Sequence, residues 1–211
     1  MSERIIAIVA NGRGLDSELA KIAVKSASVI IAVDGGAISC YQAGIRPDFI
    51  IGDFDSISRE LLDHYQDVEI IHLEDQYSTD MEKALNFVTS LSPTRLIVLS
   101  AFGKRMDHTS ANLLFLSLYN EKIPLTIYDN FGCMTILKKG KHKLKFPTGT
   151  LISFFSPYPV KNLSLTGFRY NLQNQNYEPF FVGISNVCEQ DECMVEFDSG
   201  RLFCYQVLKD E

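Results

Sequence analysis

The sequence predicts an N-terminal α/β unit, with three layers around a mostly parallel sheet, followed by a C-terminal β-sandwich. Two observations predict this division of the 211 residues. Up to Asn130, short runs rich in β-branched residues alternate with helical patterns, which is typical of β–α–β units. Beyond Asn130, short strand patterns and turn residues remain, without a helical pattern of useful length. We therefore expect one unit over residues 1–130 and a second over residues 131–211.

Six apolar runs in the first unit are expected to be strands. They are continuous rather than alternating, as is typical of strands that helices cover on both faces. The runs are Ile5–Ala10, Val29–Val33, Phe49–Ile51, Val68–Leu73, Arg95–Ser100 and Leu125–Tyr128. The segments expected to be helices are Ser17–Ser26, Ala37–Ala43, Arg59–Tyr65, Asp80–Thr89 and His108–Tyr119. Gly44 is expected to end the second helix, and Thr79 with Glu82 to form a capping box on the fourth.

The second unit is expected to consist of short strands. Residues 139–141 have the composition of a tight turn between two of them. The expected strands are Thr135–Lys138, His142–Phe146, Thr150–Ser156, Leu163–Phe168, Met194–Asp198 and Leu202–Val207, the last two joined through Ser199 and Gly200. The segment Tyr170–Tyr177, rich in Asn and Gln, is expected to be a loop.

Composition excludes several classes of protein. Apolar residues make up 46% and charged residues 22%, and the net charge of −6 comes without any basic run that nucleic acid would require. No apolar run approaches the ~20 residues that cross a bilayer, and no signal-peptide pattern is present. The five cysteines include no C-x-x-C pair and are expected to be free or buried thiols in a reducing compartment. We therefore expect a cytoplasmic protein that binds neither nucleic acid nor membrane.

Glycines, carboxylates and basic side chains directly follow five successive predicted strands. These segments are residues 11–14, 34–36, 52–56, 74–80 and 103–108. In an open parallel sheet, ligands bind in the crevice beyond the carboxyl ends of the strands. The sequence therefore predicts one polar site at one edge of one sheet.

Three aspartates in these segments favour a magnesium site. Asp34, Asp53 and Asp55 would repel one another in a crevice unless a cation offset their charge, and Mg²⁺ prefers oxygen ligands. In extended backbone, Asp53 and Asp55 point to the same side, ~6.6 Å apart along the chain. Asp80 and Asp107, taken singly, are better explained as a helix first-turn charge and a helix cap.

The basic side chains and the first loop favour a phosphate ligand. Gly12 and Gly14 do not form a dinucleotide fingerprint, because Ser17 stands where a third glycine is required, and the chain has no P-loop motif. A looser phosphate cradle at this turn remains open. Lys83, Lys104 and Arg105 are candidates for holding phosphate oxygens, although each taken alone is more often a solvated surface charge.

At this point, several motifs in fixed order resemble the thiamin pyrophosphokinase family. They are Asp34-Gly35-Gly36-Ala37, Gly44-Ile45-Arg46-Pro47-Asp48, Ile51-Gly52-Asp53-Phe54-Asp55-Ser56, Asp75-Gln76-x-x-Thr79-Asp80-x-x-Lys83, Gly103-x-Arg105-x-Asp107-His108, Gly167-x-x-Tyr170-x-Leu172 and Gly183-x-Ser185-Asn186. The chain departs from the family pattern in having Gly103-Lys104 where a glycine pair is often seen, and in having no tryptophan. The resemblance spans nearly the whole chain.

The resemblance implies an activity and a set of roles. The family transfers pyrophosphate from ATP to the hydroxyl of thiamin, giving thiamin diphosphate and AMP, with Mg²⁺, in homodimers whose thiamin sites lie between subunits. On this basis, catalytic roles fall to Asp80, Asp107 and Arg105. Nucleotide contacts fall to Asn11, Gly12, Gln76, Thr79, Lys83, Lys104 and His108. Metal ligation falls to Asp34, Asp53, Asp55 and Asp80, and thiamin contacts fall to Tyr170, Ser185 and Asn186.

Two other functions remain open from the residues themselves. Asp53 and Asp55 after an apolar strand are also compatible with a phosphohydrolase that uses an aspartyl nucleophile, although that motif normally follows the first strand. A nucleotide- or metal-binding module without catalysis is the other alternative. AMP formation that depends on thiamin distinguishes all three.

Overall fold

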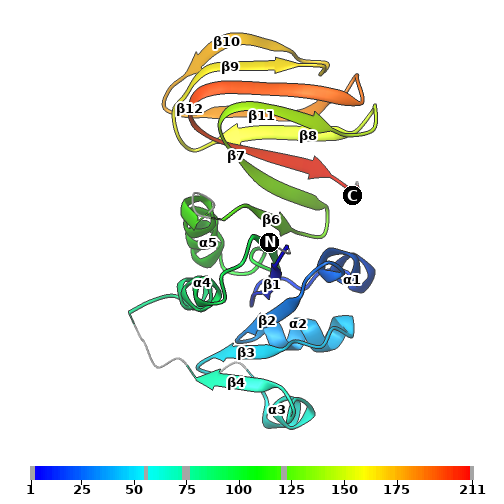
Figure 1. The fold of residues 1–211 in the computed structure, drawn as a ribbon, viewed down its shortest axis with the longest axis vertical. Helices are drawn as coiled ribbons and strands as arrows, with labels where there is room; N and C mark the ends of the chain where they lie inside the picture. Colours follow the sequence, from blue (N-terminus) through cyan, green and yellow to red (C-terminus); the bar gives the residue numbers. More distant parts are fainter. Residues whose placement is uncertain (1–2, 55–56, 73–76, 120–122, 210–211) are drawn as a thin grey trace. The chain divides into compact units, whose positions relative to one another are not determined.

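A computed structural model describes residues 3–54, 57–72, 77–119 and 123–209. The chain divides into two compact units, Met1–Asn130 and Phe131–Glu211, and each is described by itself (Figure 1).

The first unit contains a parallel sheet whose strand order is β6-β5-β1-β2-β3-β4. Its strands are β1 Ile5–Val9, β2 Val29–Val33, β3 Phe49–Gly52, β4 Glu69–His72, β5 Arg95–Leu99 and β6 Leu125–Tyr128. They agree with the predicted strands to within a residue or two at each end, and Leu73 lies outside the described residues. Strands β2, β3 and β4 extend the sheet on one side of β1, and β5 and β6 extend it on the other side. The strand order therefore reverses at the boundary between β1 and β5. This is the switch point at which open α/β sheets bind ligands.

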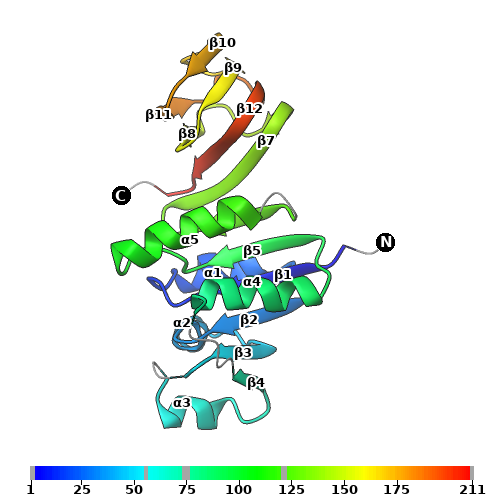
Figure 2. The same cartoon turned by 90° about the vertical axis from the view of Figure 1, so that its left-hand side faces the viewer.

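Helices cover both faces of this sheet, which confirms the predicted three layers. They are α1 Ser17–Val24, α2 Gly36–Ala43, α3 Arg59–His64, α4 Asp80–Ser90 and α5 Met106–Tyr119. The pair α1 and α2 lies on one face and the pair α4 and α5 on the other (Figures 1 and 2). Along β1, Ile5, Ala7 and Val9 are buried in the core that includes α1 and α2, and the alternate residues Ile6 and Ile8 are buried toward the opposite face.

Local signals place the helix ends where the sequence predicts them. Gly44 ends α2 with a φ of 65°, a left-handed conformation that glycine adopts at little cost. The predicted capping box begins α4, because Thr79 Oγ1 accepts from Glu82 N at 3.3 Å and Thr79 N donates to Glu82 Oε2 at 2.9 Å. Helix α5 begins at Met106 rather than at His108. The alternative that Asp107 caps this helix is therefore wrong, because Asp107 lies inside its first turn.

The second unit is all-β, as predicted. Its strands are β7 Gly132–Lys145, β8 Leu151–Ser156, β9 Val160–Thr166, β10 Leu172–Tyr177, β11 Phe181–Val187 and β12 Glu192–Val207. One edge of β12 pairs with β7, and its other edge pairs first with β9 and then with β8. Strand β10 adds to β9, and β11 adds to β8. The core between these strands includes the fully buried rings of Phe154, Phe168 and Phe197.

The two long strands of this unit correct the predicted turns. Residues 139–141 are not a turn between two strands but lie inside β7, and Ser199 and Gly200 lie inside β12. The β7–β12 ladder changes register between Phe197 and Arg201, where Gly140 and Gly200 have φ values of 129° and 99°. The two glycines therefore lie at an irregularity in a continuous antiparallel pair, and not in a turn that joins two strands.

The Asn- and Gln-rich segment is also corrected, because Leu172–Tyr177 is strand β10 rather than a loop. It is an edge strand whose polar side chains bond to its neighbour: Asn176 Oδ1 accepts from Asn162 N at 2.9 Å, and Ser164 Oγ lies 3.1 Å from Asn174 Oδ1. Strand β11 was not predicted. Among the strands that the structure describes, β11 too pairs on one side only, and its sequence lacks a continuous apolar run.

In the described residues, no helix combines the length and the apolar character needed to cross a membrane. All five cysteines are free, and four of them, namely Cys40, Cys188, Cys193 and Cys204, are buried, as predicted.

Candidate active site

A cavity of about 620 Å³ lies at the switch point of the first unit. Its walls come from the loops after β1, β2, β3 and β5 and from the first turns of α4 and α5. Most of the predicted site residues in the described part of this unit line it: Asn11, Gly12, Asp34, Asp53, Thr79, Asp80, Lys104, Arg105, Asp107 and His108. These side chains therefore lie at one cavity, as expected for residues that follow neighbouring strands of one parallel sheet.

The loops after β1 and β5 are joined by backbone hydrogen bonds that continue the pairing of these strands. Gly12 N donates to Ser100 O at 2.6 Å and Arg13 N donates to Phe102 O at 2.7 Å. A Cβ on Gly12 would lie 2.2 Å from Ser100 O and 2.5 Å from Phe102 O. The position therefore requires glycine for close approach of the two loops, and not for a dinucleotide fingerprint.

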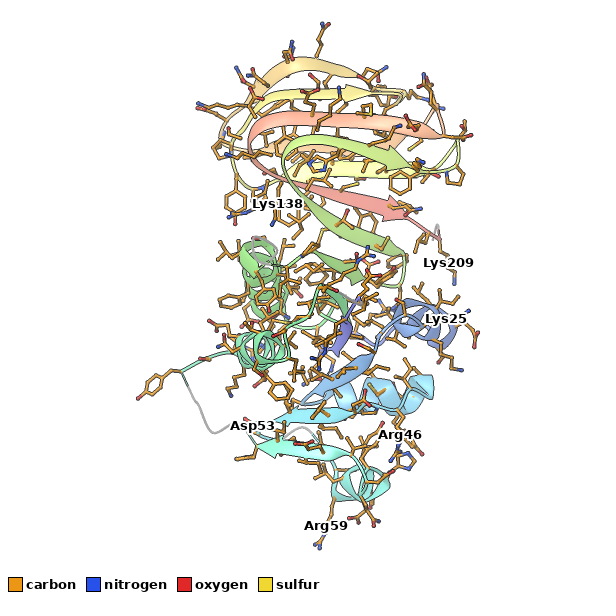
Figure 3. All side chains as sticks on the ribbon, in the orientation of Figure 1. Lys25, Arg46, Asp53, Arg59, Lys138 and Lys209 are labelled. Atoms are coloured by element: carbon orange, nitrogen blue, oxygen red, sulfur yellow. The ribbon has the colours of Figure 1, made fainter. Side chains whose placement is uncertain are left out.

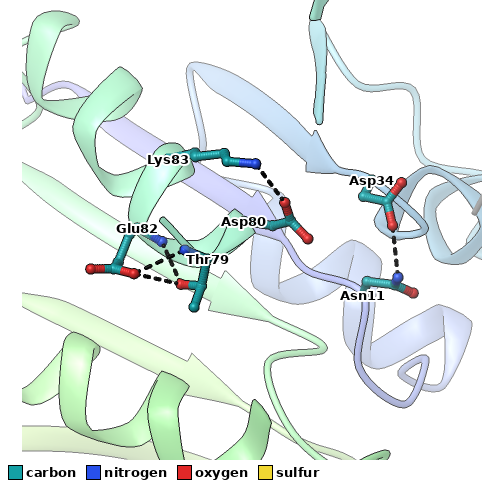
Figure 4. Close-up of polar contacts among 6 residues, drawn as sticks. All are labelled: Asn11, Asp34, Thr79, Asp80, Glu82 and Lys83. Atoms are coloured by element: carbon teal, nitrogen blue, oxygen red, sulfur yellow. Dashed lines mark hydrogen bonds and ion pairs between the residues drawn. The ribbon is translucent and has the colours of Figure 1, made fainter. Parts of the chain in front are cut away.

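Asp34 is the buried carboxylate of the site, with 3% of its surface exposed. It follows β2 with a φ of 46°, a conformation that is uncommon for residues other than glycine. Its Oδ2 accepts from Asn11 Nδ2 at 2.9 Å (Figure 4), and within the described residues its buried Oδ1 has no hydrogen-bond partner. Buried carboxylate oxygens normally have a partner, so the described structure leaves the hydrogen-bonding capacity of this oxygen unused.

Asp80 lines the same cavity from the start of α4. Its Oδ1 lies 3.4 Å from Lys83 Nζ, and Figure 4 shows this pair beside the capping box of Thr79 and Glu82. Burial raises the pKa of Asp80, Lys83 opposes that rise, and the negative charges of Asp34 and Asp53 add to it. The pKa of Asp80 is therefore raised partly because three carboxylates share one cavity.

Arg105 and Asp107 form an exposed ion pair at the cavity. Arg105 Nε and Nη2 donate to the two oxygens of Asp107 at 3.1 and 2.5 Å, and His108 N donates to Asp107 Oδ1 at 2.9 Å. The Arg105 hydrogen bond, followed by the His108 N–H, lowers the pKa of Asp107 to about 2. Asp107 in this arrangement is therefore a weak base.

Replacing Arg105 by methionine is expected to raise the pKa of Asp107 toward the ordinary aspartate value of about 3.9. The reason is that the substitution removes the strongest hydrogen bond to the ionised form. Because the wild-type pKa lies below the unfolded value, the pair stabilises the fold above about pH 4 and loses this effect as the pH falls toward 2. A carbon NMR titration of the carboxyl groups measures the shift. Asp191, whose pKa is lowered by Thr148, is the internal control, and an unchanged Asp107 would contradict the assignment.

Asp53 directly follows β3 (Figure 3). Phe54, between Asp53 and Asp55, has a φ of 65°, so the backbone is not extended at that residue, and whether the two aspartates point to the same side stays a prediction. Asp55 and Gln76 lie outside the described residues. Within the described chain, no three carboxylate, imidazole or thiolate groups are close enough together to hold a metal ion by themselves.

The predicted thiamin-side residues lie in the second unit. The Asn186 side chain is buried, accepts from Tyr170 N at 3.0 Å and donates to Tyr170 O at 2.9 Å. Its amide therefore holds the backbone of Tyr170, while the Tyr170 side chain is largely exposed. Ser185 is exposed with a φ of 58°, and its N–H donates to Ser153 Oγ at 3.0 Å.

Sequence reasoning assigned no role to several residues that shape the cavity. Met81 and Phe102 supply apolar wall, and Asn112 Nδ2 donates to Ala101 O at 2.8 Å, which ties α5 to the loop after β5. Asn112 follows the Asp107-His108 motif in the segment Ala111-Asn112-Leu113, which also resembles the family, and this resemblance was the signal that could have identified it.

A parallel sheet with a cavity of acidic and basic side chains at its switch point, followed by an all-β unit, defines a two-unit protein whose ligand site lies at the end of an open α/β sheet. The chain belongs to the thiamin pyrophosphokinase family. Residues 4–127 match the family model described as thiamin pyrophosphokinase, catalytic domain, and residues 137–202 match thiamin pyrophosphokinase, vitamin B1 binding domain.

Individual relatives agree with this assignment. Thiamine pyrophosphokinase 1 of Oryza sativa subsp. japonica is 28% identical over 174 residues, which cover 75% of this chain and 65% of that relative, just under two thirds of its length. Thiamine pyrophosphokinase of Bacillus subtilis is 26% identical over 150 residues, covering 68% of this chain and 70% of the relative. The crystal structure of thiamin pyrophosphokinase from Geobacillus thermodenitrificans superposes with a TM-score of 0.82 at 25% identity, covering 98% of this chain and 99% of that one.

Proposed function

We propose that this chain transfers pyrophosphate from ATP to the hydroxyl of thiamin, giving thiamin diphosphate and AMP, in a Mg²⁺-dependent reaction. The observation that carries the proposal is the cavity at the switch point. It combines four carboxylates, Asp34, Asp53, Asp80 and Asp107, with the cations of Lys104 and Arg105. Membership of the family supplies the identity of the two substrates.

The residues of the cavity fit a divalent cation. Within the described residues, Asp34 Oδ1 has no hydrogen-bond partner. The negative charges of Asp34 and Asp53 also raise the pKa of Asp80, and a bound cation would offset this repulsion. Because no three of the described groups are close enough together to hold the ion alone, Asp34, Asp53 and Asp80 would each supply only part of its coordination. Asp55, which lies outside the described residues, is proposed as a further ligand, and water and phosphate oxygens would complete the coordination. When bound, the ion would neutralise charge on the phosphate oxygens, which contributes several kcal/mol to phosphoryl transfer as an order of magnitude.

The side chains of the cavity divide the remaining work. Lys104 and Arg105 would bind phosphate oxygens from the cavity wall, and the loop at Asn11 and Gly12 would receive the polyphosphate beside them. Lys83 pairs with Asp80 and does not line the cavity, and it is proposed as a further phosphate contact. Thr79 and His108, which line the cavity, are proposed as further nucleotide contacts, as is Gln76, which lies outside the described residues. Since phosphoryl transfer requires mainly orientation and charge stabilisation, these contacts account for most of the catalysis.

Asp80 and Asp107 are the two candidates for the base that accepts the proton, and they are not equally suited to that role. Asp80 lines the cavity, and an Asp80 oxygen that does not bind Mg²⁺ would be available to accept the proton from the thiamin hydroxyl. Asp107 has a pKa lowered to about 2 and is better suited to orienting Arg105. We therefore assign the base to Asp80 and the positioning of the guanidinium to Asp107.

Thiamin is proposed to contact Tyr170 and Ser185, with Asn186 holding the Tyr170 backbone in place. A homodimer is proposed as the working form, and the exposed apolar side chains of Phe180, Val182 and Ile184 at β11 support an interface with a second copy. The free cysteines support a cytoplasmic location.

Incubation of the protein with ATP, Mg²⁺ and thiamin tests the function, with chromatographic detection of AMP and thiamin diphosphate. We expect equal amounts of the two products, and AMP only when thiamin is present. Phosphate release without thiamin, together with an acyl-phosphate on Asp53, would indicate the hydrolase instead. ATP binding without any product would indicate a non-catalytic module.

A further inference from the structure

The side-chain amide of Asn11 lies between a cation and a buried carboxylate. Its Nδ2 donates to Asp34 Oδ2 at 2.9 Å, and its Oδ1 accepts from Lys104 Nζ at 2.8 Å. Asp34 is buried, whereas Lys104 is exposed at the cavity. The three side chains come from the ends of β1, β2 and β5 and form one chain of hydrogen bonds.

The backbone around Asn11 fixes its position. The hydrogen bonds from Gly12 N and Arg13 N to the loop after β5 bring Asn11 close to the segment that carries Lys104. On its other side, a Cβ on Gly35 would lie 2.2 Å from Asn11 Oδ1 and 2.8 Å from Asn11 Nδ2. The Asn11 side chain therefore packs directly on the Gly35 backbone and has little room to move.

Asp34 determines which way the Asn11 amide faces. An ionised carboxylate only accepts hydrogen bonds, so it selects the NH₂ end of the amide. The oxygen end is then turned toward Lys104, whose ammonium only donates. The opposite orientation would place an oxygen against the carboxylate and an NH₂ group against the ammonium, with neither hydrogen bond formed.

We propose that Asn11 is a positioning residue for Lys104. Asp34 orients the Asn11 amide, and the amide oxygen holds the Lys104 ammonium at the cavity, where two of its three N–H groups remain available to phosphate oxygens. A free lysine side chain loses considerable rotamer freedom when it binds a ligand, and a side chain already held in place loses less. The inference rests on the proposed function only in taking the polyphosphate of ATP as the ligand.

Calorimetry of ATP binding in the presence of Mg²⁺ and without thiamin tests the inference in a set of variants. Lys104→Met is expected to weaken ATP binding about tenfold, because a charged hydrogen bond is lost. Asn11→Ala is expected to weaken it about fivefold in the wild-type background, because Lys104 is no longer held. In the Lys104→Met background, Asn11→Ala is expected to have no further effect. Thermal unfolding establishes that each variant is folded.

The exposed Lys25, at the end of α1 (Figure 3), provides the matched control for charge, and Lys25→Met is expected to leave ATP binding unchanged. The inference is overturned if Asn11→Ala weakens binding by the same factor with and without Lys104, because Asn11 would then act independently. It is also overturned if Asn11→Ala alone has no effect, or if Lys25→Met weakens binding as much as Lys104→Met. Since no thiamin is present, these outcomes are separate from the proposed function, which fails when the wild-type protein forms no AMP with thiamin.

Discussion

Asp53→Asn is expected to lower the turnover number about a thousandfold while the protein stays folded. Asp53 lines the cavity, and its charge raises the pKa of Asp80, so the two carboxylates act on the same space. Asparagine keeps the shape of the side chain but removes the charge that would hold a divalent cation. Because Asp53 is exposed, the substitution is expected to change the free energy of unfolding by no more than about 0.5 kcal/mol.

The matched control is Asp63→Asn, at an exposed position on α3 in the same unit and away from the cavity. Both variants lose one negative charge, and only the first is expected to lose activity. Steady-state formation of AMP at saturating ATP, thiamin and Mg²⁺ measures the effect. Activity of Asp53→Asn within tenfold of the wild type would remove Asp53 from the proposed metal ligands.

Gly12→Ala is expected to lower the free energy of unfolding by about 2–3 kcal/mol and to abolish most of the activity. The added methyl group would meet backbone atoms of Ser100 and Phe102 at 2.8 Å or less, and backbone atoms cannot rotate away as a side chain can. The loops after β1 and β5 would have to separate. That movement would displace Asn11 and Lys104 from the cavity.

Gly14→Ala is the control for this prediction, because it makes the same chemical change two residues further along the same loop. Its added methyl group would meet Ser39 Oγ at 3.5 Å, which is ordinary contact. Chemical denaturation should therefore separate the two variants by about 2 kcal/mol. Equal stabilities would show that the close approach at Gly12 is not a constraint on the folded state.

The first unit could be predicted because its signals are local. Continuous apolar runs identify strands covered on both faces, and the capping box at Thr79 and the glycine after α2 determine two helix ends. In the second unit, glycine occurs both in tight turns and at irregularities within a strand pair, so Gly140 and Gly200 did not reveal which was present. The continuous strands β7 and β12 could therefore not be distinguished from two hairpins. The polar edge strand β10 is stabilised by pairing with β9, a contact that composition does not reveal.

In the candidate active site too, some features could be predicted from the sequence and others could not. Asp34, Asp53, Lys104 and Arg105 could be assigned to one cavity because each follows a strand of one parallel sheet. The contact between Asn11 and Lys104 joins residues 93 positions apart and depends on the loops after β1 and β5 approaching to backbone hydrogen-bond distance. The bond from Asn186 to Tyr170 likewise depends on how two strand ends meet. Neither has a signature in the residue pattern.

The dependence of ATP binding on Mg²⁺ most directly tests the claim that the carboxylates of this cavity coexist around a divalent cation that also binds polyphosphate. Calorimetric titration of the wild-type protein with ATP is made once with Mg²⁺ and once with a chelator, without thiamin. We predict binding at least about tenfold tighter with Mg²⁺, because without a cation the carboxylates repel the phosphates. Equal affinity under the two conditions would contradict the claim.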